Sequence, residues 1–387
     1  MTDNDQLTAT ALRLALDREV AKHQLSSGAW PRLERRLRRQ PQRRAAIVGV
    51  CTAIVATAAT VAPYLWDGLP GPLASHPPPQ PGPHLLIGDR AQVSSTGPLT
   101  TGYGGVWIIG PGVIYRVDPA TARTVATIPT PGTSGKGSQI VTGAGAVWAT
   151  SNGGHVGVYR IDPRHNRVMS FIRLQPNPIG IAVAHGRVWV TEPKEGPGIV
   201  VRIDPRTNRV SGPPIRVGLG PGSIVSGAGT LWVSGMDYVS RINPATGAVI
   251  NAHSGPWGGT DSSGNARISR IDAAGAGSLW TTGVNVVQRV DPANGHVTAA
   301  IPVPHAWSVI YWHGLAWALT GVGPSGLGTV VAIDPASNHV VIHGIPIRGA
   351  PVAIAAGPAG LWAILANRNH TSQQLVHLSS TPDPTDG

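Results

Sequence analysis

Hydrophobic residues follow two different patterns along the 387-residue chain. Residues 45–66, AAIVGVCTAIVATAATVAPYLW, form one continuous run of 22 residues without a charged side chain. As a helix rising 1.5 Å per residue, this run would span about 33 Å, enough for the hydrocarbon core of a bilayer. Beyond residue 84 the apolar runs are short and are separated by polar residues and tight turns, which is typical of β-strands. The chain is therefore predicted to combine one membrane helix with an all-β domain.

The residues on either side of the apolar run predict its orientation. The arginine-rich stretch RLERRLRRQPQRR, residues 32–44, precedes it, and Tyr64 and Trp66 lie at its far end. Because basic residues stay on the cytoplasmic side, we expect a cytoplasmic N-terminus, a single-pass anchor in the cell membrane and an exported remainder. A cleaved signal peptide, with Ala59 and Ala62 as small residues near a cleavage site, is the alternative. The long leader and long apolar run favour an anchor that is kept.

Composition divides the rest of the chain. Residues 68–84 hold seven prolines in 17 residues, which predicts an extended spacer between the membrane and the next domain. The predicted organisation is a basic helical stub (1–44), a transmembrane helix (45–66), a Pro-rich linker (67–83), a repeat domain (84–378) and a disordered tail (379–387).

A repeat fills the exported part. Each copy begins with a Gly-rich turn followed by a tryptophan, and seven such tryptophans recur at spacings of 37–48 residues: Trp107, Trp148, Trp189, Trp232, Trp280, Trp317 and Trp362. Six copies continue into an apolar strand that ends in Asp-Pro or Asn-Pro, beginning at Asp118, Asp162, Asp204, Asn243, Asp291 and Asp334. A unit of about 42 residues with four short strands is the size of one β-propeller blade.

Seven copies predict a seven-bladed β-propeller whose repeated tryptophans are core residues. The last copy lacks its outermost strand, and the segment HLLIG, residues 84–88, precedes the first Trp by the distance expected of one. We expect this N-terminal strand to complete the final blade and close the ring, which removes an exposed sheet edge. An open solenoid of the same units is the alternative.

Charge and cysteine content exclude some functions. The net charge is +11, but residues 1–44 contribute +5 of it, and no Lys/Arg-rich run lies beyond Arg44. No nucleic-acid partner is therefore expected. The one cysteine, Cys51, cannot form an intramolecular disulfide.

The repeated pattern of GRVWVT, VVRIDPRTNRV and small-residue inner strands resembles the YVTN-repeat and streptogramin B (virginiamycin B) lyase-like seven-bladed propellers on an actinobacterial-type anchored chain. The resemblance covers residues 84–378 and implies the propeller fold. One branch of that family implies a lyase that uses histidine and glutamate side chains with magnesium. The nearest match to that branch's GxLWFTE unit is RVWVTE, with Glu192. Its catalytic positions cannot be carried over to this chain.

Candidate binding residues lie on one rim of the predicted propeller. The turns on the other rim are regular, whereas the loops between the second and third strands, and between successive blades, diverge. Candidates on this rim are Glu192, Lys194, Glu195, Asp237, Tyr238, Trp257, Asp261, His305, Trp307, Arg348 and His370. Trp257 and Trp307 lie outside the repeat register and could stack on a sugar or apolar ligand, or cap the end of the propeller. Glu192, Lys194 and Glu195 are expected in a solvated loop.

No nucleophile elbow, phosphate loop, CxxC, HExxH or calcium-loop motif is present, so no catalytic residue, cofactor or metal ligand is predicted. The sequence favours a non-catalytic binding module for a protein, glycan or small molecule. A metal-assisted lyase or hydrolase and a structural cell-envelope protein are the alternatives.

Overall fold

The computed structural model describes residues 85–380, apart from 94–96, 135–136, 176, 228, 236–237, 255–270, 284, 294, 322–326, 359 and 367–372. For 85–93, 251–254, 348 and 379–380 it describes the backbone only. The chain divides into two units, Met1–Pro79 and Gln80–Gly387, and every described strand belongs to the second. Within the described residues no helix is long and apolar enough to cross a membrane. The predicted stub, membrane helix and linker all lie outside those residues.

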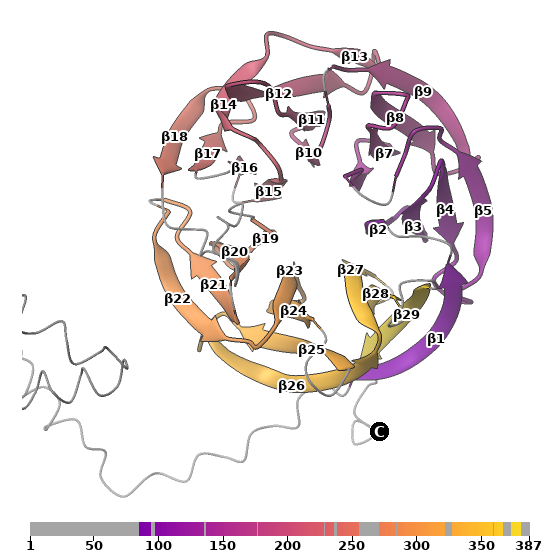
Figure 1. The fold of residues 1–387 in the computed structure, drawn as a ribbon, viewed down its shortest axis with the longest axis vertical. Coiled ribbons are helices and arrows are strands. Elements are labelled where there is room, and N and C mark those ends of the chain that lie inside the picture. The colour runs from indigo at the N-terminus through magenta and orange to yellow at the C-terminus, as the bar shows by residue number, and fades with distance from the viewer. Residues whose placement is uncertain are drawn as a thin grey trace, which may run out of the picture. The chain divides into compact units, whose positions relative to one another are not determined.

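Seven antiparallel sheets surround a common axis (Figure 1). We number these blades 1–7 from Leu99 onward and name their strands A to D from the axis outward. Blades 1–3 consist of β2 (Leu99–Gly102), β3 (Gly105–Gly110), β4 (Val113–Val117) and β5 (Thr124–Pro129); β6 (Ile140–Gly143), β7 (Ala146–Ser151), β8 (Gly157–Asp162) and β9 (Arg167–Arg173); and β10 (Ile181–Ala184), β11 (Arg187–Glu192), β12 (Pro197–Asp204), β13 (Arg209–Val210) and β14 (Ile215–Leu219).

The remaining blades complete the ring. Blades 4–7 consist of β15 (Ile224–Gly227), β16 (Thr230–Ser234), β17 (Tyr238–Ile242) and β18 (Val249–Ser254); β19 (Ala273–Gly275), β20 (Ser278–Gly283), β21 (Val286–Val290) and β22 (Val297–Pro302); β23 (Ala306–Trp312), β24 (Leu315–Thr320), β25 (Leu327–Asp334) and β26 (His339–Arg348); and β27 (Ala350–Gly357), β28 (Gly360–Ala366), β29 (Gln373–Ser380) and β1 (Leu85–Val93). In blade 3 the outer strand is split into β13 and β14, because Pro213 and Pro214 between them have no N–H to donate.

The ring closes through its first strand. β1 pairs with β29 from Leu85 opposite Ser380 to Val93 opposite Gln373. At the inner end of the same junction, the Thr101 hydroxyl of blade 1 donates a hydrogen bond to the Ala356 carbonyl of blade 7. The prediction that the N-terminal strand completes the last blade is confirmed, and the open solenoid is wrong.

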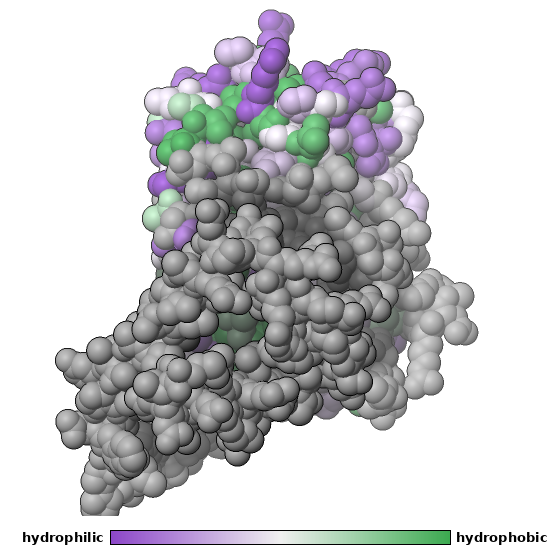
Figure 2. Space-filling model, turned by 60° about the vertical axis from the view of Figure 1, so that its left-hand side comes forward, coloured by the Kyte–Doolittle hydropathy of each residue, from purple (hydrophilic) through white to green (hydrophobic). Residues whose placement is uncertain are grey.

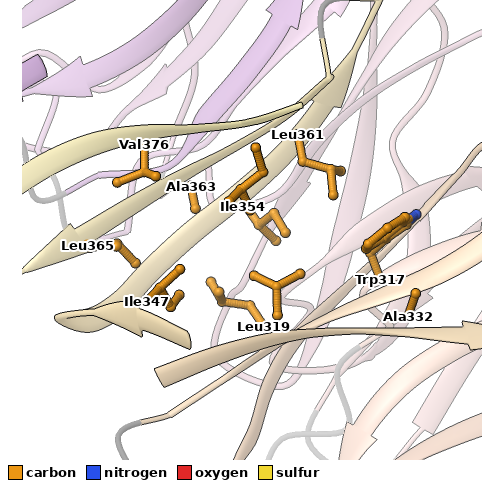
Figure 3. Packing of buried hydrophobic residues seen from close by; sticks show 11 residues of the cluster. Trp317, Leu319, Ala332, Ile347, Ile354, Leu361, Ala363, Leu365 and Val376 are labelled. Carbon is orange, nitrogen blue, oxygen red and sulfur yellow. The ribbon is translucent and has the colours of Figure 1, made fainter. Parts of the chain in front are cut away.

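Tryptophans fill the spaces between blades. All seven repeat tryptophans are 0–2% exposed. At the junction of blades 6 and 7, Trp317 and Leu319 pack with Ile354, Leu361 and other aliphatic side chains (Figure 3). Apolar residues from both sheets form each such cluster, so a blade buries its faces only against its neighbours. The prediction that these tryptophans are core residues is confirmed.

An arginine two positions before the Asp-Pro or Asn-Pro pair covers the tryptophan in blades 1–5. The guanidinium carbons of these arginines lie 5.2–5.9 Å from the ring centroids: Arg116, Arg160, Arg202, Arg241 and Arg289. The Arg160 Nη1 atom also donates to the next blade, at 2.5 Å to the Pro205 carbonyl and 2.7 Å to Asn208 Oδ1. Arg116 and Arg289 make the same two bonds to blades 2 and 6. One side chain thus joins its own core to the turn of the following blade.

The arginine is absent from blades 6 and 7. Blade 6 has Ala332 at this position, and the turn between strands C and D of blade 7, which would receive an arginine, does not exist because β1 supplies that blade's outer strand. Blade 7 has His377 instead, whose ring stacks on Trp362 with centroids 4.3 Å apart. The closure of the ring therefore accounts for the missing arginine of blade 6 but not for that of blade 7, because blade 1 has a C–D turn.

Replacement of Arg160 by alanine is expected to lower the free energy of unfolding by about 2–4 kcal/mol, because a cation–π contact and two charged hydrogen bonds are lost together. Arg160→Lys should recover only part of the loss, since an ammonium cannot reproduce the planar fork. Urea denaturation measures both. Exposed Arg164, in the adjacent turn, is the matched control, and its alanine variant should change stability by less than about 0.5 kcal/mol. Equal losses at the two positions would contradict the role of Arg160.

Candidate functional site

The propeller has two chemically different rims. The turn rim carries the A–B and C–D turns, and the loop rim carries the B–C loops and the connections between blades. Turn-rim carboxylates accept hydrogen bonds from the backbone of their own turns: Asp118 Oδ1 accepts from the Ala120 N–H at 2.8 Å, and the same bond recurs at Asp204 and Asp334. Leu85 pairs with Ser380 at the turn-rim ends of β1 and β29, so the described chain both enters and leaves the ring there. The loop rim is the opposite end.

Glu192 is a buried acid at the loop rim. It is the last residue of β11, pairs with Ile199, and shares the sheet face of Val190, which packs against blade 2. Its side chain is 2% exposed, and its Oε1 atom is enclosed without a hydrogen-bond partner. Burial raises the pKa of Glu192 to about 7, against a smaller opposing effect of Lys194. An enclosed acceptor of this kind costs about 1–3 kcal/mol and calls for an explanation beyond packing.

The interpretation of Glu192 as a solvated loop residue is wrong. Thr191 and Glu192 belong to β11, whereas Lys194 and Glu195 are exposed in the loop as expected. The strand continues to Glu192 because its backbone pairs with Ile199 of β12, which buries the side chain against the neighbouring blade.

Two other blades have a polar side chain at the position of Glu192, and in both it is hydrogen-bonded within the same blade. In blade 2 the Ser151 hydroxyl donates to the His155 carbonyl at 2.5 Å, and in blade 6 the Thr320 hydroxyl lies 2.9 Å from that of Thr329. These short hydroxyls reach partners in their own B–C hairpin. The longer and acidic Glu192 replaces this local bond with an acceptor that has no donor within the described residues.

A series of hydroxyls behind the loop rim joins blades 2–6. Each is the second residue after the repeat tryptophan, and each bonds to the backbone where the next blade begins: Thr150, Thr191, Ser234 and Thr282. Thr191 is representative, since its Oγ1 accepts from the Gly180 N–H at 2.8 Å and donates to the Gly222 carbonyl at 2.9 Å. Blades 1, 6 and 7 have Ile109, Leu319 and Ile364 at this position. Hydrogen bonds thus fix the rim around Glu192, which favours a preformed surface.

Trp307 lies exposed on the loop rim of blade 6. It occupies a bulge in β23 between Ala306, which pairs with Thr320, and Ser308, which pairs with Leu319. Its side chain is 53% exposed, which leaves the indole free to stack on a ligand. Beside it, His305 is exposed at a positive φ of 58°. The His305 N–H donates to Asn285 Oδ1 at 2.9 Å, which fixes the connection that carries Trp307.

The other sequence candidates divide into three groups. Tyr238 is a core residue rather than a surface residue, 7% exposed and packed in the cluster between blades 3 and 4, because Gly218 and Gly235 leave room for its ring. Arg348 ends the outer strand β26 and is not in a loop. The remaining candidates lie outside the described residues: Asp237, Trp257, Asp261 and His370.

Sequence reasoning missed Asp272. Its Oδ2 accepts from both the N–H and the hydroxyl of Thr282, each at 3.1 Å, and the Thr282 hydroxyl reaches the Trp307 carbonyl at 3.5 Å. The sequence could have indicated it, because Asp272 is an acidic residue directly before an inner strand of small residues, and no other blade has an acidic residue at this position. Asp272 therefore fixes Thr282, whose single hydroxyl proton can go either to Asp272 or to the Trp307 carbonyl.

Metal-ligating residues do not gather in the part of the chain that the structure describes. Over residues 85–380, without the gaps given above, no group of three or more His, Cys, Asp or Glu side chains could hold a metal ion. What the described loop rim offers is an unpartnered buried acceptor on blade 3 and an exposed indole on blade 6.

Comparison with known proteins adds information on the fold alone. No known family matches the sequence, and no curated protein matches it. Among solved structures, hydrazine synthase from Kuenenia stuttgartiensis matches with a TM-score of 0.53 at 13% identity, covering 75% of this chain and 98% of that one. The extracellular domain of what is described as a one-component system from B. thetaiotaomicron matches with a TM-score of 0.54 at 15% identity, covering 78% of this chain and 44% of that one. By its fold the protein is a seven-bladed β-propeller.

Proposed function

We propose that this chain is a membrane-anchored, extracytoplasmic binding module that holds a protein, glycan or small-molecule partner on its loop rim and catalyses no reaction. The observation that carries this proposal is the enclosed Glu192 Oε1 atom, an acceptor without a donor on the rim where the repeats diverge. A partner group that displaces the side chains around this atom would complete the hydrogen bond by donating an N–H, O–H or ammonium proton.

The anchor and the position of the chain ends support this orientation. The 22 uncharged residues 45–66 follow an arginine-rich segment, which favours export of the propeller. β1 begins at the turn rim, so the loop rim is the end of the propeller opposite the start of β1. The likeness to an extracellular domain agrees with an exported propeller.

Trp307 supplies the second half of the proposed surface. An exposed indole held in a backbone bulge stacks on sugar rings or apolar groups at low entropic cost, since its backbone is already fixed. Blades 3 and 6 lie across the ring from each other (Figure 1), so a partner that contacts both residues spans the loop rim, with a hydrogen-bond donor at one side and a flat or apolar face at the other.

Binding is expected to weaken at least tenfold in Trp307→Ala, which removes the indole, and in Glu192→Leu, which removes the acceptor oxygen. The probe is the solubilised envelope fraction of the producing cells, passed over the full-length chain immobilised through its N-terminus, with retained protein and glycan quantified. Met169→Ala is the control, because Met169 is 49% exposed but lies toward the turn rim. Retention that is unchanged in both loop-rim variants, or lost only in Met169→Ala, would overturn the proposal.

We also propose a family for the chain. The phased GxxW and RIDP units support a divergent relative of the YVTN-repeat propellers. No described residue specifically favours the lyase branch, so the binding function is preferred over the metal-assisted lyase and over a purely structural envelope protein.

A further inference from the structure

Exposed hydrophobic side chains recur at one place in the repeat. Within the described residues ten large hydrophobic side chains are exposed, and seven of them lie on outer strands six or seven residues after the Asp or Asn that opens the C–D turn. The six blades with such a turn each supply at least one, and blade 4 supplies two: Val125, Met169, Val210, Val249, Ile250, Val297 and Val341, which are 41–53% exposed. Single exposed aliphatic residues are ordinary, but residues at one of two adjacent positions near the start of strand D in each of these six blades form a collar around the turn rim. Packing within their own blades does not require these side chains to be apolar, because strand D is the outer edge of each sheet.

Arginines accompany the collar on blades 1–3. Arg123, Arg167 and Arg209 hold the same repeat position, five residues after the turn aspartate, and all three are exposed. Arg164 and Arg206 add two exposed guanidinium groups in the turns of blades 2 and 3.

The arginines of blades 2 and 3 outnumber the acids of these turns. Asp162 Oδ2 lies 2.6 Å from His165 Nδ1, and Asp204 Oδ2 lies 2.5 Å from Arg187. Both aspartates also accept backbone N–H bonds of their turns. The outward-facing charge of blades 2 and 3 is therefore positive. Figure 2 shows apolar residues interspersed with hydrophilic ones at the top of the ring, where Figure 1 labels β13 and β14.

We infer that this collar of aliphatic and arginine side chains rests on the surface of an anionic lipid bilayer. Aliphatic tips enter the headgroup region while guanidinium groups bind lipid phosphates. An anionic bilayer offers both an apolar interior and phosphate groups. The position of the chain ends supports this occupant, because β1 joins the ring at the turn rim, after the 22-residue apolar run. The inference rests on the proposed anchor and adds that the propeller lies on its membrane with the loop rim outward.

The test uses the full-length chain in lipid nanodiscs. In a Cys51→Ser background, Met169→Cys carries an environment-sensitive fluorophore, and Glu195→Cys, in the exposed loop-rim segment, is the matched control. Discs contain brominated phosphatidylcholine with or without about one third phosphatidylglycerol. We expect at least twofold quenching at position 169 in the anionic discs, weaker quenching in the neutral discs and none at position 195. Arg206→Glu combined with Arg209→Glu should abolish the difference between the two lipids.

The outcomes separate the collar from the anchor. A chain that enters the discs but is unquenched at position 169 contradicts the collar while the anchor stands. A chain that is not retained in the discs contradicts the anchor and the collar with it. A fluorophore at position 169 that responds to protein concentration but not to brominated lipid means that the collar binds a second copy, which also overturns the inference. Cooperative thermal unfolding of each labelled chain, compared with the parent, verifies the fold.

Discussion

A chain that lacks residues 1–93 is expected to unfold or aggregate, whereas one that lacks residues 1–79 should fold normally. The first deletion removes β1, whose backbone pairs with β29 along its whole length, and leaves blade 7 with three strands. The core of that blade includes Val376 and Leu378 on β29, which would lie beside an open sheet edge. The loss should be on the order of 5 kcal/mol or more, comparable with the total stability of many domains. Size-exclusion chromatography and thermal unfolding by circular dichroism compare the two truncations.

Complementation supplies a control for this deletion. A synthetic peptide of residues 84–94 should restore cooperative unfolding to the shorter chain, because strand addition at an open edge depends mainly on backbone hydrogen bonds. A peptide with the same composition in scrambled order should restore less. If the chain without residues 1–93 melts cooperatively within about 2 °C of the chain without residues 1–79, β1 does not close the ring.

Wild-type stability is expected to fall as the pH rises from about 4.5 to about 7, and Glu192→Gln should remove this fall. The pKa of Glu192 is raised from 4.5 to about 7 in the folded chain, so the folded state holds its proton more tightly than the unfolded state does. The stabilisation is therefore fully present below about pH 4.5 and is lost as the pH rises through about 7. Its size is at most ~3 kcal/mol. Urea denaturation of both chains across this range measures the difference.

Glu195 provides the matched control for this titration. It lies three residues away in the same hairpin but is exposed, so Glu195→Gln should follow the wild-type pH dependence. Above pH 7 the Glu192→Gln chain should be the more stable one, because a neutral amide avoids the cost of an enclosed charge. Parallel curves for wild type and Glu192→Gln would show that the carboxyl is not the group that titrates.

The propeller could be predicted from the sequence because its signals are local and repeat. Each Gly-rich turn before a tryptophan, and each Asp-Pro after a strand, marks one position of a four-stranded unit regardless of its neighbours. The closing strand could be predicted as well, since the last copy ends before its outer strand and HLLIG precedes the first copy.

The burial of individual side chains could not be predicted in the same way. Glu192 precedes Pro193 and Lys194 and so resembles the start of a loop, but a neighbouring blade about 40 residues earlier in the chain covers its side chain. Tyr238 resembles a loop aromatic, but two glycines from different segments make room for it in the core. The role of Arg160 depends on a turn in the next blade, which its own repeat does not contain. Contacts between blades decide all three.

The loop rim as the binding surface is tested most directly by photo-crosslinking in living cells. Benzoylphenylalanine replaces Trp307 on the loop rim in one strain and Met169 on the turn rim in another, with both side chains about half exposed. A partner on the loop rim predicts a discrete crosslinked adduct from position 307 that protease added outside the cell can degrade, and no protein adduct from position 169. Adducts from position 169 with none from position 307 would contradict it.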